Sequence, residues 1–214
     1  MTGRSFFLGS ILLLALLPTA CGAASAPQMR GAAAQNSIAA FSSGAETQQL
    51  AEYGHLERQR MDIPKNAPAA IQGKTFSISA QELHALCSEY QLAGNYSAEE
   101  AMAMARQELT EKYALYSHAT AQGFAVEESV LDALIADEQA FDEISAEDRR
   151  AFMQGFGANE SLYWSLRRED LRMYETIDLW RQSCRSTYTG EDFAAYCAAL
   201  TEDILEAEQI TVLA

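Results

Sequence analysis

The sequence predicts a mainly α-helical domain of about six helices, closed by a small two-stranded pairing of its two ends. Apolar residues recur at steps of three and four along most of the chain after residue 79, which is the spacing of one helix face. Residue types that cap helices stand just before these segments. Residues 75–78 and 209–213 alternate apolar and polar side chains, as short strands do. Because they flank the helical part, we expect these two segments to pair with each other.

The first 20 residues have the pattern of an export signal. Arg4 is the single charge before an apolar run, 6–17, and small Thr19 and Ala20 precede Cys21. The run is too short to span a bilayer, which takes roughly 20 apolar residues. This ending resembles the lipobox of bacterial lipoproteins, a family in which the cysteine thiol is lipidated and becomes the new N-terminus. The alternative is an ordinary signal peptide with an incidental Cys21.

The lipobox resemblance implies that residues 1–20 are a lipoprotein signal peptide and that Cys21 is the lipid anchor. We therefore expect the mature protein outside the cytoplasm, held by lipid on the outer face of the bacterial cytoplasmic membrane. Residues 21–73 are expected to be a flexible tether and linker, because their first half is rich in Ala, Ser, Gly and Gln and has few large apolar groups. Within this segment, residues 45–61 could form a short helix. The folded domain is expected over residues 74–214.

Three helices are expected in the first half of this domain. Ser79 and Ser97 each stand three residues before a glutamate, which is a capping box and predicts helices over 79–93 and 97–122. A third helix is expected over 127–141, with its apolar stripe facing inward. This stripe consists of Val130, Leu131, Leu134 and Ile135.

Three more helices are expected in the second half. Ser145 and Asn159 are the cap residues of predicted helices over 145–155 and 159–184, and a sixth helix is predicted over 191–207. The long fifth helix carries apolar residues at helical spacing, which we expect to face the core. They are Leu162, Leu166, Met173, Ile177 and Trp180.

The charge is strongly negative and unevenly distributed. Removing residues 1–20 from the 214 leaves 194 residues with a formal charge of −16, of which residues 21–78 contribute +1 and the rest −17. Such a domain repels the phosphates of nucleic acids and gains nothing from an anionic membrane surface. We therefore expect no nucleic-acid partner, and contact with the membrane only through the lipid on Cys21.

The sequence contains no motif of a catalytic, cofactor or metal site. There is no G-x-S-x-G, no phosphate-binding loop and no H-E-x-x-H, and the three histidines are isolated. We expect no enzyme activity, no cofactor and no metal. Beyond Cys21, the cysteines Cys87, Cys184 and Cys197 allow either one disulfide and one free thiol or three buried thiols. For Cys87, near His84, a core position is favoured over a nucleophile.

Three stretches together resemble a known family. They are Phe76-Ser77-Ile78-Ser79, the helix junction at residues 119–130 (ATAQGFAVEESV) and the helix–glycine turn–helix at 152–164 (FMQGFGANESLYW). Their order is similar to the N-terminal chaperone domain of the SurA and PrsA group of extracytoplasmic foldases, whose fold is distantly related to the trigger factor C-terminal domain. The resemblance covers residues 74–213 and implies a helical cradle that holds unfolded or partly folded exported chains.

The chain departs from this family at one place. Full-length members carry a parvulin-type prolyl isomerase domain between the long fifth helix and the closing helix. Here that connection is residues 185–190, which is too short to contain a catalytic domain. We therefore expect no isomerase activity.

Client binding would need accessible aromatic and methionine side chains, which adapt to varied sequences. The best candidates lie around the glycine turn, which could present them together: Phe152, Met153, Phe156, Tyr163 and Trp164. Burial in the core of the domain is the competing interpretation for each. The arginines of the fifth helix are expected to pair with acids on adjacent helices or, alternatively, to attract acidic client segments. They are Arg167, Arg168, Arg172, Arg181 and Arg185.

Two functional hypotheses follow. The first is a lipid-anchored, SurA-like holdase that binds unfolded or partly folded exported polypeptides through apolar helical surface. The second is an accessory lipoprotein of the cell envelope that binds one specific folded partner.

Overall fold

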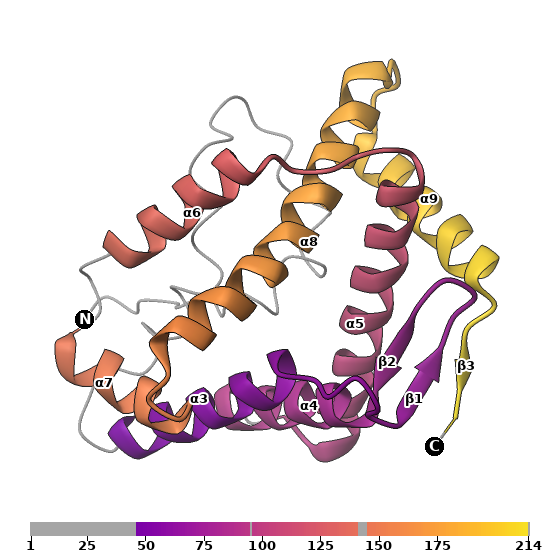
Figure 1. Ribbon diagram of the computed structural model, residues 1–214. Coiled ribbons are helices and arrows are strands. Elements are labelled where there is room, and N and C mark those ends of the chain that lie inside the picture. The colour runs from indigo at the N-terminus through magenta and orange to yellow at the C-terminus, as the bar shows by residue number, and fades with distance from the viewer. Residues whose placement is uncertain (1–45, 95, 141–144, 214) are drawn as a thin grey trace, which may run out of the picture.

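The computed structural model describes residues 46–94, 96–140 and 145–213, and this part of the chain is mainly helical, as predicted (Figure 1). The described ranges hold seven helices: α3 (Glu46–Met61), α4 (Ala80–Gly94), α5 (Ala98–Ala121), α6 (Glu128–Ala140), α7 (Ala146–Gly155), α8 (Glu160–Thr187) and α9 (Phe193–Glu208). They also hold three strands: β1 (Ala69–Gln72), β2 (Ser77–Ser79) and β3 (Thr211–Val212). The predicted signal peptide, the anchor Cys21 and most of the tether lie outside the described residues.

The helices begin where short polar side chains can cap them. At α5, Ser97 and Glu100 form a complete capping box, in which each side chain accepts a hydrogen bond from the other residue's backbone N–H. Ser145 and Asn159 cap α7 and α8, and Asp192 caps α9. All six predicted helices are present, and each begins within two residues of its predicted start.

The sheet differs from the expected two-stranded pairing. Its order is β2-β1-β3 and both pairings are antiparallel, so the expected direct pairing of 75–78 with 209–213 is wrong. Ile71 of β1 lies between them, paired with Ile78 of β2 on one side and Val212 of β3 on the other. The sequence does not mark β1, because Ala-Ala-Ile-Gln is short, does not alternate and follows two prolines that indicate a loop.

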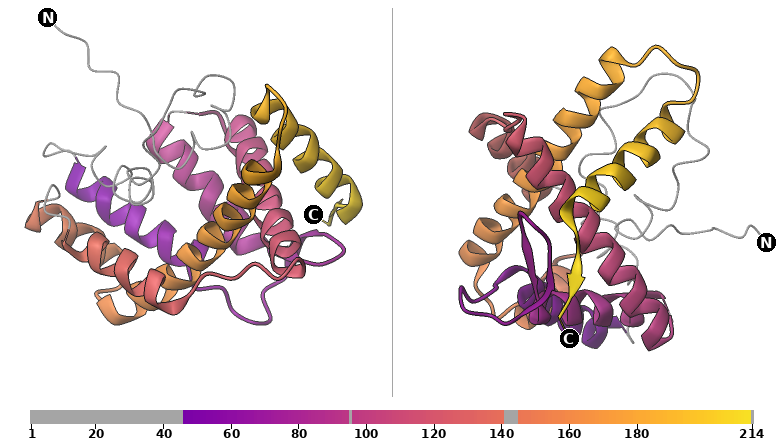
Figure 2. Two further views of the ribbon diagram at one scale, coloured as in Figure 1. Left: turned by 90° about the horizontal axis from the view of Figure 1, so that it is seen from above. Right: turned by 90° about the vertical axis from the view of Figure 1, so that its right-hand side faces the viewer.

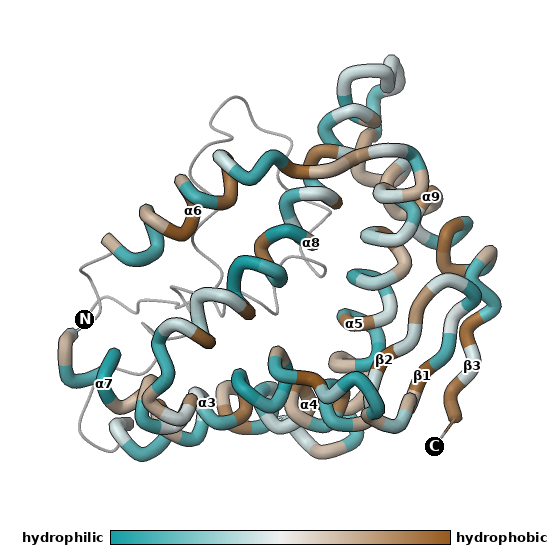
Figure 3. The backbone as a smooth tube through the Cα atoms, viewed as in Figure 1, coloured by the Kyte–Doolittle hydropathy of each residue, from teal (hydrophilic) through white to brown (hydrophobic). Residues whose placement is uncertain are grey.

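The helices form a base with longer helices rising from it (Figures 1 and 2). In the base, α3 packs against both α7 and α4, and α4 packs against α5. Helix α8 crosses from α7 towards α5, α6 lies along α8, and α9 returns beside α5 to the sheet. In Figure 3, hydrophobic stretches mark β1, β3 and α6, whereas α8 is largely hydrophilic.

Apolar contacts gather in several clusters. One joins the sheet to α4 and α5, a second joins α3, α7 and the start of α8, and a third joins α5, α8 and α9. Ile71 of β1 is almost completely buried in the first cluster, and Leu50 of α3 in the second. Residues 46–72, expected to be linker, therefore pack into the same folded unit. On α6, Leu131 faces inward as expected, but Val130 does not, since it is 41% exposed.

Candidate functional site

The predicted client-binding residues lie together, but three of the five are in the core. Phe152, Phe156 and Tyr163 are buried, and the Tyr163 ring lies 5.4 Å from the ring of Phe152 and 5.1 Å from that of Phe156. Met153 and Trp164 pack against the same cluster and are half-buried. Phe152, Phe156 and Tyr163 therefore pack against α3 rather than facing solvent, and in this conformation a client cannot reach these three rings.

Large exposed apolar side chains of the described residues are few and lie on different elements. They are Val130 on α6, Tyr174 and Leu179 on α8, Tyr196 on α9, and Val212 and Leu213 at the C-terminal strand. Isolated exposed apolar residues of this kind are ordinary on protein surfaces. One of them, however, belongs to a larger aromatic group.

That group lies at the tip of the α8–α9 hairpin, which projects away from the base (Figure 1). Tyr188 stacks on Tyr196 with 4.9 Å between ring centroids, and lies 5.6 Å from the ring of Phe193. The guanidinium of Arg185 lies 4.8 Å from the Phe193 centroid, in a cation–π contact. The Tyr188 hydroxyl donates a hydrogen bond of 2.8 Å to the carbonyl of Asp192. The tip aromatics, as we call Tyr188, Phe193 and Tyr196, are thus held in place by neighbouring groups.

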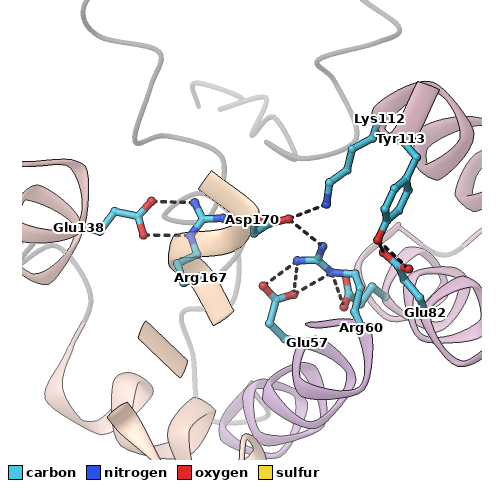
Figure 4. Close-up of polar contacts among 9 residues, drawn as sticks. Glu57, Arg60, Glu82, Lys112, Tyr113, Glu138, Arg167 and Asp170 are labelled. Atoms are coloured by element: carbon cyan, nitrogen blue, oxygen red, sulfur yellow. Dashed lines mark hydrogen bonds and ion pairs between the residues drawn. The ribbon is translucent and has the colours of Figure 1, made fainter. Parts of the chain in front are cut away.

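A second feature is a network of charged side chains in the interior (Figure 4). At its centre, Asp170 of α8 accepts hydrogen bonds from Lys112 of α5 at 2.6 Å and from Arg167 at 2.9 Å. Arg60 of α3 lies 3.8 Å from the same carboxylate. Each of these four side chains is at most 11% exposed. The three cations hold the pKa of Asp170 well below its usual range despite burial.

Further carboxylates continue the network outward. Arg167 donates two hydrogen bonds to Glu138 of α6, at 2.7 and 3.0 Å. Arg60 donates to both oxygens of Glu57, its neighbour one turn earlier on α3. Such bidentate arginine–carboxylate pairs are the strongest polar contacts available to side chains. Helices α3, α5, α6 and α8 are thereby joined through their charged groups.

Three buried glutamates beside this network, Glu82, Glu89 and Glu108, accept no hydrogen bond from an arginine or lysine among the described residues. Glu82 accepts a hydrogen bond from the Tyr113 hydroxyl at 2.9 Å, and Glu108 accepts a very short one from the Tyr90 hydroxyl. Glu89 lies 3.4 Å from Arg60. Burial is the largest cause that raises the pKa of Glu82, of Glu89 and of Glu108.

Each cation of the network has a carboxylate bonded to it. Three cations, Arg60, Lys112 and Arg167, face three carboxylates that are bonded directly to them. The carboxylates are those of Glu57, Glu138 and Asp170. The pKa of each of the three remaining glutamates of the network, Glu82, Glu89 and Glu108, is raised, which favours their neutral forms. No sequence motif predicts this network.

The outer arginines of α8 confirm the predicted pairing with neighbouring helices. Arg168 bonds to Glu128 and Asp132 of α6, and Arg172 bonds to the same Glu128. These hydrogen bonds lower the pKa of Glu128 to about 2. Arg167, Arg168 and Arg172 therefore hold α6, whereas Arg185 lies over the ring of Phe193 on α9.

The described residues offer little catalytic chemistry. They contain no cluster of three or more His, Cys, Asp and Glu side chains placed to hold a metal ion. Cys87, Cys184 and Cys197 are free thiols, and burial raises the pKa of each, which is opposite to what a reactive thiolate requires. The charged groups of the network are engaged with one another.

Comparisons with known proteins identify no relative: no family model, curated protein or solved structure matches this chain. The resemblance to the SurA and PrsA group therefore stays a prediction. Among the described helices, none combines the length and the apolar character needed to cross a membrane.

Proposed function

We propose that this protein is an exported, lipid-anchored binding module that holds one folded partner of the cell envelope and catalyses no reaction. The observation that carries the proposal is the group of tip aromatics at the end of a projecting hairpin. Clustered aromatic side chains beside an arginine are the residue types that contribute most of the energy at protein interfaces. Export and the anchor at Cys21 rest on the lipobox resemblance.

The burial of Phe152, Phe156 and Tyr163 supports this form over a general holdase. A holdase needs broad accessible apolar surface, and the exposed large apolar side chains of the described residues are scattered. A small aromatic patch on a rigid support suits one complementary surface better than many unrelated sequences.

Photo-crosslinking in cells tests the proposal. A photo-reactive amino acid replaces Thr189, which is exposed within the tip, and the matched control replaces Asp137, which is exposed on α6. We expect one dominant crosslinked species from the tip and none from α6. A graded series of many adducts from the tip would instead support the holdase, and absence of adducts would contradict binding at the tip.

A substitution makes the same experiment quantitative. With the crosslinker at Thr189, Tyr196→Ala should weaken binding of the partner by about 2 kcal/mol. This is roughly a thirtyfold loss of affinity, as expected for a central aromatic contact. Val130→Ala removes an equally exposed apolar side chain from α6 and should leave the adduct unchanged. Equal effects of the two variants would argue against a specific tip interface.

A further inference from the structure

The first half of α9 is apolar all round, yet none of its residues is buried. Residues 193–200 (FAAYCAAL) are eight apolar or aromatic residues in succession, each half-buried or exposed. The buried residues of α9, Ile204 and Glu208, both lie in its second half. A helix that is apolar on every side is typical of a segment that is covered on every side. The first half of α9 therefore has more apolar surface than its contacts with the described residues use.

One side of α9 packs against α5, and the other side is exposed. Leu200, Ile204 and Leu205 belong to the apolar cluster that contains Leu115 of α5. The opposite side carries four exposed residues at steps of four, three and four, which places them along one helix face. They are Ala195, Ala199, Glu202 and Glu206, and we call them the outer stripe of α9. Helix α9 lies at an outer edge of the molecule (Figure 2, left), so a partner can approach this face.

The apolar half of the outer stripe is shaped for a neighbouring helix. Small side chains let two helix axes approach to the lower end of the usual range of about 8–10 Å. In α5, four alanines lie in such contacts and are completely buried: Ala101, Ala105, Ala114 and Ala119. Ala195 and Ala199 are exposed instead. Tyr196, one of the tip aromatics, lies next to Ala195 and is 39% exposed, so the outer stripe continues the aromatic patch.

The other half of the outer stripe is acidic. Glu206 lies in the last turn of α9, which contains no base, and the negative end of the helix dipole disfavours an acid there. Glu208 in the same turn is buried and accepts hydrogen bonds from Thr75. By contrast, Glu202 and Glu206 are exposed and form no ion pair with a described residue. These two acids therefore favour a positively charged group from outside the fold.

We propose that the outer stripe of α9 is the docking surface for a basic amphipathic helix of the partner. Large apolar side chains of that helix pack over Ala195 and Ala199, and its lysines or arginines lie over Glu202 and Glu206. A second copy of this chain fits poorly, because residues 79–214 carry a net charge of −17 and two copies repel each other. An anionic membrane is repelled in the same way. This inference rests on the proposed function and names the segment that the partner contributes.

Fluorescence anisotropy with a labelled model peptide and the full chain tests the proposal. The probe is a helix of about 20 residues with leucines along one face and lysines at one end of that face. The control peptide has glutamates in place of the lysines and should bind at least about tenfold more weakly, because like charges then face each other.

Two variants of the chain locate the site of binding. Ala199→Lys places a long charged side chain where the leucines would pack and keeps a good helix former, so we expect a loss of affinity of at least about tenfold. Ala103→Lys, at an exposed alanine of α5, makes the same change in net charge and should bind the lysine peptide as wild type does.

Several results would overturn the proposal. They are no binding of the lysine peptide, equal binding of the two peptides, and equal losses in Ala199→Lys and Ala103→Lys. A dimer of the wild-type chain in sedimentation that Ala199→Lys abolishes would assign the face to a second copy. Binding of the wild-type chain to phosphatidylglycerol vesicles that Ala199→Lys abolishes would assign it to a membrane.

Crosslinking in cells separates this inference from the proposed function. A photo-reactive amino acid replaces Ala198, which is exposed beside the outer stripe. We expect the same adduct from Ala198 as from Thr189. An adduct from Thr189 without one from Ala198 would leave the tip interface in place and reject the outer stripe, whereas no adduct from either position would reject both.

Discussion

Asp170 is the residue on which the interior charges converge. It contacts Arg60 of α3, Lys112 of α5 and Arg167 of its own helix, α8. Each of these cations has at least one further contact, with another charged group of the network or with an aromatic ring. A buried ion pair with complete hydrogen bonding adds little net stability by itself, because desolvation offsets the attraction. Removing one member is different, because it leaves the others buried and uncompensated.

Replacing Asp170 with asparagine should therefore destabilise the folded protein strongly. Asp170→Asn keeps the shape of the side chain but leaves three cations facing two remaining carboxylates, and we expect a loss of about 3–5 kcal/mol in the free energy of unfolding. Urea unfolding at neutral pH measures it. Asp137→Asn, at an exposed position on α6, should change the free energy by less than about 0.5 kcal/mol. Equal effects of the two substitutions would show that Asp170 is not the centre of the network.

At the scale of elements, the contact between α3 and α7 depends on two glycines. A Cβ added to Gly155 would lie 1.7 Å from the carbonyl oxygen of Ala51, and one added to Gly54 would lie 2.1 Å from that of Phe152. The two backbones approach each other so closely that no side chain fits between them. This close packing excludes solvent from the apolar cluster that contains Phe156.

Gly155→Ala should consequently push α7 away from α3. Because the obstruction is backbone, which cannot rotate aside, we expect a loss of at least about 1–3 kcal/mol in the free energy of unfolding. Gln154→Ala, one residue earlier and exposed, is the control and should be nearly neutral. Thermal unfolding followed by circular dichroism distinguishes them. A Gly155→Ala protein with the same melting temperature as wild type would refute this account of the contact between α3 and α7.

The sequence predicts the elements better than their contacts. Caps such as Ser97 and Asn159 act within one turn, so a local pattern is enough to locate the starts of α5 and α8. Strand β1 exists only through its pairing with two distant strands, and no local signal marks it. The strands at 75–78 and 209–213 were therefore expected to pair directly, although both in fact pair with β1.

The charge network shows a similar limit, because its contacts join residues far apart in the chain. Lys112 and Asp170 are separated by 58 positions, and spacing within a helix cannot show that they meet. One signal was available. Glu82 and Glu89 are seven residues apart, two turns on one helix face that also carries Leu86, and acids within an apolar stripe indicate buried partners. For Phe152 and Phe156, helical spacing was equally consistent with exposure and burial.

At the scale of the whole molecule, the network links the base to the rising helices. Glu57 and Arg60 come from α3, Glu89 from α4, Lys112 from α5, and Glu138 and Asp170 from α6 and α8. Its two kinds of carboxyl respond oppositely to pH. The stabilisation from Asp170 is present above its usual pKa and is lost only in strong acid, whereas that from the raised glutamates is lost as the pH rises through their folded pKa values. The free energy of unfolding is therefore highest in the mildly acidic range.

Burial in the interior of this acidic domain raises the pKa of Glu82, Glu89 and Glu108 and so favours their neutral forms. Carbon-13 NMR of the side-chain carboxyl groups, with the residues assigned by single substitutions, measures this most directly. The account predicts that the carboxyl shifts of Glu82, Glu89 and Glu108 titrate at a higher pH in the folded protein than glutamates of the unfolded chain, and that Asp170 titrates at a lower pH than an unfolded aspartate. Titration of Glu82, Glu89 and Glu108 at or below the pH at which glutamates of the unfolded chain titrate would contradict it.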